Sequence, residues 1–232
     1  MTSMSHAANG FQTNGYHIQE AVLCGKAIAA LQPDLANTPT EGAGTRNLLQ
    51  EVWCQQLAQD LMSSPEMAAL MPQGYMAIQC TYFEKSPERN WLVALHQDLS
   101  IPIRKWVKHP QLHSWSRKEN SLFLQPPRSI LEQLIAVRIH IDTCGLNDGP
   151  LKVVPGTHLQ GILTEEQAIA LRTRTGEVVC VTNPGDALVM KPLLLHASSK
   201  AKGHSRRRVL HFLYGPSQLP WGLEWPLVSS LL

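Results

Sequence analysis

Charged residues are scarce in this sequence: Asp, Glu, Lys and Arg occupy 16% of its 232 positions, against about 25% in typical soluble domains. With 44% hydrophobic residues, the chain can bury a core, which excludes a disordered protein. The net charge of +2 is too small to indicate a nucleic-acid partner. No hydrophobic run reaches the roughly 18 residues that a membrane helix needs. We therefore expect a soluble protein that binds neither nucleic acid nor membrane.

Cysteines are also few. The chain has five, an odd number, and none of them forms a Cys-x-x-Cys pair. This pattern argues against a disulfide framework or a zinc site and favours free thiols in a reducing compartment. Residues 1–14 lack the basic and apolar blocks of a signal peptide. We expect a cytoplasmic protein whose residues 1–232 form a single domain.

Hydrophobic spacing divides the chain into a helical first part and a β-rich remainder. Over residues 15–72, apolar positions recur every three to four residues at 18–31 and again at 49–61, and Pro33 is expected to end the first helix. A loop is expected at 34–45. A third helix is predicted from Ser64, with Pro65 in its first turn and Pro72 at its end.

Short β-type runs follow between about residues 75 and 215. They are 75–83, 91–98, 133–142, 151–154, 178–182, 187–195 and 207–214. Turn signals separate them, such as Pro184-Gly185, where glycine suits the positive φ of a type II turn. The pattern predicts a sandwich or barrel rather than a parallel sheet, and we expect a mainly β fold with a jelly-roll core and flanking helices.

The run 133–142 alternates between apolar and polar residues. Its isoleucines and valine are expected to face an apolar layer formed by the helices, so that Arg138 and His140 face the interior of the barrel. A solvent-facing edge strand is the alternative that the pattern leaves open.

Three residues have the types and spacing of a metal site. His96 and Asp98 are two positions apart on a predicted strand and therefore point to the same side, and His196 lies far downstream. Two imidazoles and one carboxylate leave coordination positions open, as non-haem Fe(II) oxygen chemistry requires. A His-x-Asp pair also arises by chance, so the assignment depends on the surrounding motifs.

Five ordered blocks of sequence resemble the phytanoyl-CoA dioxygenase family of Fe(II)- and 2-oxoglutarate-dependent oxygenases. They are Leu95–Asp98, Asn147–His158, Gly185–Val189, His196–Ser198 and Arg207–Leu210. The segment 10–16 resembles the start of that family, and the resemblance covers nearly the whole chain, with 34–45 and 99–132 the least matched. The family has a double-stranded β-helix fold.

The resemblance implies that His96, Asp98 and His196 bind iron. It also implies that Arg207 pairs with the distal carboxylate of 2-oxoglutarate, with Arg206 as the alternative if the register shifts. Two further positions match cosubstrate or substrate contacts of the family, Ser198 and Arg138. The motif at 155–158 is expected to be a structural turn, and Asn147-Asp148-Gly149 departs slightly from the acidic-Asn-Gly turn of the family.

The expected reaction uses O2 and 2-oxoglutarate, releases succinate and CO2, and hydroxylates an unactivated C–H bond of a small molecule. The intact Asp98 argues against halogenation, because related halogenases have a small residue there. Basic and aromatic residues in 99–132 predict a lid over an anionic substrate, although a solvated loop would share that composition. Two alternatives remain: a non-catalytic jelly-roll module that serves as a sensor or structural subunit, with or without the metal, and a cupin-like metalloenzyme that does not use 2-oxoglutarate. The substrate and the oligomeric state stay open.

Overall fold

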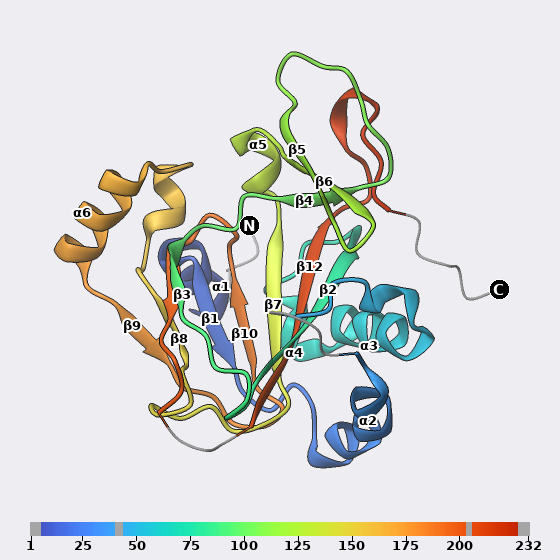
Figure 1. Cartoon of the computed structure of the whole chain (residues 1–232), viewed down its shortest axis with the longest axis vertical. Coiled ribbons are helices and arrows are strands. Elements are labelled where there is room, and N and C mark those ends of the chain that lie inside the picture. Colours follow the sequence, from blue (N-terminus) through green and yellow to red (C-terminus); the bar gives the residue numbers. More distant parts are fainter. Residues whose placement is uncertain (1–5, 40–43, 203–205, 227–232) are drawn as a thin grey trace.

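The computed structural model describes residues 6–39, 44–202 and 206–226 and contains three antiparallel sheets (Figure 1). The five-stranded sheet has the order β1 (Tyr16–Gln19), β10 (Ala187–Met190), β7 (Ile135–His140), β12 (Arg207–Pro216) and β2 (Tyr75–Lys85). The four-stranded sheet has the order β3 (Val93–His96), β11 (His196–Ser198), β8 (Leu151–Val153) and β9 (Val178–Cys180). The three-stranded sheet has the order β4 (Ile101–Ile103), β6 (Ser121–Gln125) and β5 (His113–Lys118).

Helices flank the sheets, as the sequence predicts. They are α1 (His6–Asn14), α2 (Gly25–Asn37), α3 (Val52–Ser63), α4 (Pro65–Ala68), α5 (Arg128–Leu131) and α6 (Glu165–Thr175), with 3-10 turns at Leu48–Gln50, Thr157–Gln160 and Pro220–Gly222. Helices α2, α3 and α4 lie on one side of the five-stranded sheet, and the four-stranded sheet lies on the other (Figure 1). The predicted jelly-roll fold with flanking helices is confirmed. Among the described residues, no helix is both long enough and apolar enough to cross a membrane.

Strand β7 shows how the sequence separates the two sides of the larger sheet. Ile135, Val137 and Ile139 are buried in one cluster with Leu57 and Leu61 of α3, whereas Arg138 points the other way and lines the cavity between the sheets. The alternation therefore predicted the direction of these side chains correctly. The edge-strand alternative is wrong, because β7 pairs with β10 on one side and β12 on the other.

The N-terminal part differs from the prediction in two ways. Ile18 belongs to strand β1 rather than to a helix, since it pairs with Leu188 of β10 and packs between the sheets. Helix α2 starts at Gly25 and continues through Pro33 to Asn37. Proline removes one helical hydrogen bond, but Leu35 beyond it is almost fully buried, and burying such a side chain contributes about 1.5–3 kcal/mol. Ser64 caps α4 as predicted by accepting a hydrogen bond from the backbone of Met67, although α4 ends at Ala68, before Pro72.

The segment 99–132 is more ordered than the predicted loop. It contains β4, β5, β6 and α5, and Ile101 and Leu124 are buried in the cluster between the sheets. Helix α6 was also missed, because Ala168 is its one buried residue and it has no apolar stripe. Its capping box, in which the side chains of Thr164 and Gln167 bond to each other's backbone, was the available signal.

Candidate metal centre and cosubstrate pocket

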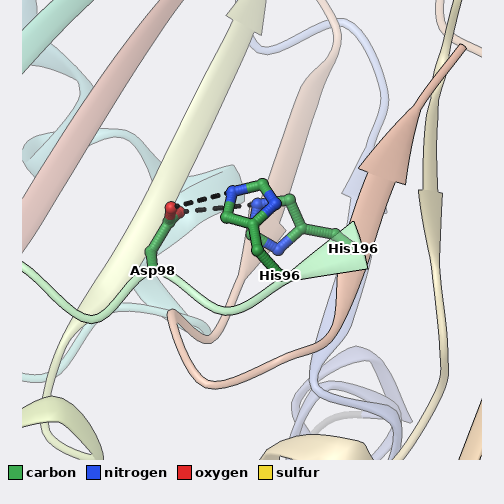
Figure 2. Close-up of side chains that lie close together, drawn as sticks. All are labelled: His96, Asp98 and His196. Atoms are coloured by element: carbon green, nitrogen blue, oxygen red, sulfur yellow. Dashed lines mark ion pairs between the residues drawn. The ribbon is translucent and has the colours of Figure 1, made fainter. Parts of the chain in front are cut away.

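Three side chains from separate parts of the sequence meet at one end of the four-stranded sheet. His96 ends β3, His196 begins β11, and the two residues are directly paired in the register of these strands. Asp98 lies just beyond the end of β3, where its backbone N–H donates to the carbonyl of Pro192 at 2.9 Å. One ligand atom from each of the three lies within 4.8 Å of the others, and the side chains point toward one another (Figure 2).

Backbone hydrogen bonds fix the orientation of both imidazole rings. Nδ1 of His96 is 2.8 Å from the carbonyl of Ala94, and Nδ1 of His196 is 2.9 Å from the carbonyl of Leu194. A carbonyl accepts but cannot donate, so Nδ1 carries the proton in each ring and Nε2 presents its lone pair. These Nε2 atoms lie 3.4 Å (His96) and 3.7 Å (His196) from the carboxylate oxygens of Asp98 (Figure 2).

The electrostatic environment keeps the carboxylate of Asp98 charged and the ring of His196 neutral, as metal binding requires. Burial raises the pKa of Asp98, but the neighbouring His196 and His96 outweigh it and hold that pKa well below its ordinary value. Burial lowers the pKa of His196 to about 4, although Asp98 opposes the shift. Burial also lowers the pKa of His96, but Asp98 more than compensates and raises it overall. Two imidazole nitrogens and one carboxylate suit Fe(II) and leave open coordination positions, so these residues could hold iron.

A cavity of about 660 Å³ extends from this cluster between the two larger sheets. Three buried cations line it, namely Lys85, Arg138 and Arg207, which are 1%, 7% and 4% exposed. Among the described residues that line the cavity, Asp98 is the one carboxylate. The interior is therefore positively charged next to a candidate metal site.

Strand alternation separates the roles of the three consecutive arginines. Arg206 is exposed and its guanidinium donates to the carboxylate of Glu84 at 2.8 and 3.0 Å. Arg208 likewise points away from the cavity and pairs with Asp142 at 2.7 and 2.8 Å. Arg207 faces the cavity, where one Nη donates to the carbonyl of Gly149 at 2.5 Å and Nε has no partner among the described residues. This geometry favours Arg207 over the alternative, Arg206.

Lys85 is a candidate that the sequence reasoning missed. It is the strand partner of Arg207, and its Nζ donates to Oγ of Ser198 at 2.9 Å and to the carbonyl of Ser199 at 2.8 Å. Burial and the charge of Arg207 lower the pKa of Lys85 to about 8. The signal was the alternation along β2, where the cavity-facing positions are Gln79, Thr81, Phe83 and Lys85. Ser198 thus lies in the pocket with both cations.

Arg138 lies nearer the metal cluster. One of its Nη atoms is 2.8 Å from Nδ1 of His211, which must accept because a guanidinium can only donate. Its guanidinium also lies over the ring of Phe83, 5.5 Å from the centroid. Burial, followed by the charge of Arg138, lowers the pKa of His211 to about 3, so that histidine is neutral.

Other predicted residues lie outside the cavity or at its rim. In the motif at 155–158, the hydroxyl of Thr157 donates to the carbonyl of Val154 and accepts from the backbone of Leu195, which fixes the chain just before His196. The structural reading of this motif therefore fits the geometry. The basic residues of 99–132 mostly face outward. Arg104 and Lys105 both pair with Glu224, and Lys118 is the one of these cations that lines the cavity.

This fold and this cluster define a class, the jelly-roll oxygenases that use non-haem iron. The chain belongs to the phytanoyl-CoA dioxygenase (PhyH) family, whose sequence model matches residues 11–209, more than four fifths of its length. It is an Fe(II)- and 2-oxoglutarate-dependent dioxygenase, and the cofactors of this class are iron, 2-oxoglutarate and O2.

Solved structures with the same fold include AviO1 from Streptomyces viridochromogenes Tue57, with a TM-score of 0.62 and 21% identity over 95% of this chain and 99% of that one. EctD from S. alaskensis has a TM-score of 0.69 and 18% identity over 95% and 81%. HygX from Streptomyces hygroscopicus, solved with nickel and 2-oxoglutarate bound, has a TM-score of 0.64 and 15% identity over 94% and 90%. No curated protein matches the sequence of this chain.

Proposed function

We propose that this chain hydroxylates an unactivated C–H bond of a small molecule, with His96, Asp98 and His196 as the iron ligands. In the balanced reaction, one oxygen atom of O2 enters the product hydroxyl group and the other enters succinate, while 2-oxoglutarate loses CO2. The observation that carries the proposal is the arrangement of three convergent ligand atoms at a cavity that also contains buried, unpaired cations.

The protein contributes position and charge to this reaction. Bound iron and 2-oxoglutarate supply the oxidising power when they react with O2. Nε2 of His96, Nε2 of His196 and a carboxylate oxygen of Asp98 would hold the metal, next to the cavity in which 2-oxoglutarate and the substrate would bind. Asp98 also fills the position that related halogenases leave open for a halide, which favours hydroxylation.

Arg207 and Lys85 are the proposed anchor for the distal carboxylate of 2-oxoglutarate. Both are buried without a carboxylate partner among the described residues, and an arginine can hold a carboxylate through two parallel hydrogen bonds. Ser198 orients Lys85 through its hydroxyl. The carbonyl of Gly149 orients the guanidinium of Arg207.

The segment 99–132 is the proposed lid. Its residues Leu99, Ile101 and Phe123 line the cavity beside the metal ligands, where they would exclude water from the reacting atoms. Lys118 lies over the ring of Phe123 at 5.1 Å, which places one exposed cation at the rim of this wall.

The test is an anaerobic titration of metal-free protein with Fe(II) and then 2-oxoglutarate. We expect a weak visible metal-to-ligand charge-transfer band that Asp98→Ala abolishes. Arg207→Ala should raise the 2-oxoglutarate concentration needed for the band, whereas Arg206→Ala is the matched control and should leave it unchanged.

Each alternative has its own outcome in this experiment. Iron binding without the band would favour a cupin-like enzyme that does not use 2-oxoglutarate. A folded protein that binds no iron would favour the non-catalytic module. A wild-type response in Arg207→Ala would refute the assignment of the cosubstrate anchor.

A further inference from the structure

We propose that the substrate of this enzyme carries a carboxylate, and that Arg138 binds it beside the metal centre. The inference rests on the proposed function, because it assumes that iron and 2-oxoglutarate occupy the same cavity. It adds the chemical class of the substrate and the residue that selects it.

The charges of the cavity are the first reason. Lys85, Arg138 and Arg207 are buried cations in its lining, and Asp98 is the one carboxylate among the described residues that line it. The two positive charges of Fe(II) cancel the two negative charges of 2-oxoglutarate. The imbalance of three cations to one carboxylate therefore remains in the loaded site, and burying unpaired charge is costly. A second anion would reduce this excess.

The position of Arg138 is the second reason. On the proposed function, both carboxylates of 2-oxoglutarate would already have partners, one at the metal and the other at Arg207 and Lys85. Arg138 is the strand partner of His211, which is four residues from Arg207 on β12, a separation of about 13 Å along the strand. The charge of Arg138 also acts on all three candidate metal ligands, so Arg138 lies at the metal end of the cavity, where a substrate C–H bond must approach.

The free edge of the guanidinium is the third reason. One Nη of Arg138 is bonded to His211, and the face of the guanidinium lies over Phe83, so two neighbours fix its plane. Neither Nε nor the other Nη has a hydrogen-bond partner among the described residues, and no carboxylate of that part of the chain forms an ion pair with Arg138. An Nε–Nη edge held in one orientation matches the two oxygens of a carboxylate.

The experiment measures binding rather than turnover. Protein loaded with Ni(II) and saturated with 2-oxoglutarate is titrated calorimetrically with two matched pairs of probes, phenylacetate against phenylacetamide and hexanoate against hexanamide. We expect each acid to bind at least 10-fold more tightly than its amide. Arg138→Gln should remove this preference while the Kd of 2-oxoglutarate changes less than 3-fold.

Two further variants sharpen the result. Arg138→Lys keeps the charge without the two-pronged edge and should retain part of the preference, which also covers the case in which the glutamine variant does not fold. Arg206→Gln is the matched control, because it removes an exposed arginine that pairs with Glu84 outside the cavity, and it should leave the preference for acids intact.

Equal binding of acids and amides to the wild-type protein would overturn the inference. A loss of 2-oxoglutarate affinity of more than 10-fold in Arg138→Gln would also overturn it, because Arg138 would then be a cosubstrate ligand. Failure of the proposed function looks different, since the wild-type protein would not bind 2-oxoglutarate at all.

Discussion

A single added methyl group at Gly149 should weaken 2-oxoglutarate binding without touching the ligand. Gly149 has a φ of +65°, and a Cβ built on it would lie 2.5 Å from the backbone oxygen of Ser199. The carbonyl of Gly149 accepts from Arg207, and the carbonyl of Ser199 accepts from Lys85. To relieve the clash in Gly149→Ala, one of these backbone segments must move, and a proposed cosubstrate anchor moves with it.

Gly74→Ala provides the matched control. Gly74 also has a positive φ, +76°, but a Cβ there would have no atom within 4 Å. Both variants incur about 1–2 kcal/mol for an alanine in the left-handed region, so this backbone cost is common to the two. In Gly149→Ala alone, a displaced Arg207 or Lys85 also weakens a charged hydrogen bond to 2-oxoglutarate, which costs about 1.5–3 kcal/mol of binding free energy. This loss corresponds to a 2-oxoglutarate Kd about 10- to 100-fold higher.

Calorimetric titration of the Ni(II)-loaded variants with 2-oxoglutarate measures this difference, and thermal unfolding measures the shared backbone cost. The reasoning is refuted if Gly149→Ala and Gly74→Ala bind 2-oxoglutarate with the same Kd while both are folded. Equal binding would mean that the turn at Gly149 does not position Arg207 or Lys85.

Three further predictions concern metal binding and stability. Asp98 raises the pKa of His96 above its ordinary 6.5, so a proton competes with the metal for Nε2 already above pH 6.5. As the pH is lowered, the affinity for Ni(II), measured by equilibrium dialysis, should therefore begin to decrease before pH 6.5 is reached. An affinity that stays constant down to pH 5 would contradict this. Burial lowers the pKa of His140 to about 3, so the unfolded chain binds more protons than the folded one between about pH 6.5 and 3. The free energy of unfolding of the metal-free protein should therefore decrease as the pH is lowered through that range, and it should decrease less steeply in His140→Asn. In urea unfolding, Arg208→Ala should cost about 1.5–3 kcal/mol of stability because it breaks a partly buried ion pair with Asp142. Arg206→Ala should cost less than about 1 kcal/mol because its ion pair with Glu84 is exposed. Equal losses of stability in the two variants would argue against this ranking.

The sequence predicted correctly those parts of the fold in which a local residue pattern is compatible with a single structure. The alternation at 133–142 gave the direction of Arg138, and Pro184-Gly185 gave a turn in which Gly185 has a φ of +90°. The spacing of His96 and Asp98 likewise placed both side chains on one side, although Asp98 lies just past the strand. In each case the relevant geometry is local, so the sequence was sufficient.

The parts that sequence reasoning missed depend on distant partners. Ile18 fits a helical spacing, yet its segment pairs with β10, about 170 positions away along the chain. Within 99–132, β5 is charged and mostly exposed, whereas β4 and β6 are short and become buried by packing into the cluster between the sheets. Lys85 was missed because the predicted strand ended at residue 83, and its partners Ser198 and Ser199 are more than 110 residues away.

The two faces of the five-stranded sheet contribute in opposite ways to the free energy of folding. On the helical side, Val137, Ile139 and Leu210 are fully buried and stabilise the fold. On the cavity side, burial and Arg207 lower the pKa of Arg138 to about 10, which shows that its charge is held at a cost. The apolar face must offset that cost in the empty protein. Anions that enter the cavity reduce this cost of burying positive charge. The cations that destabilise the protein without ligands therefore favour the binding of 2-oxoglutarate and, on our inference, of an acidic substrate.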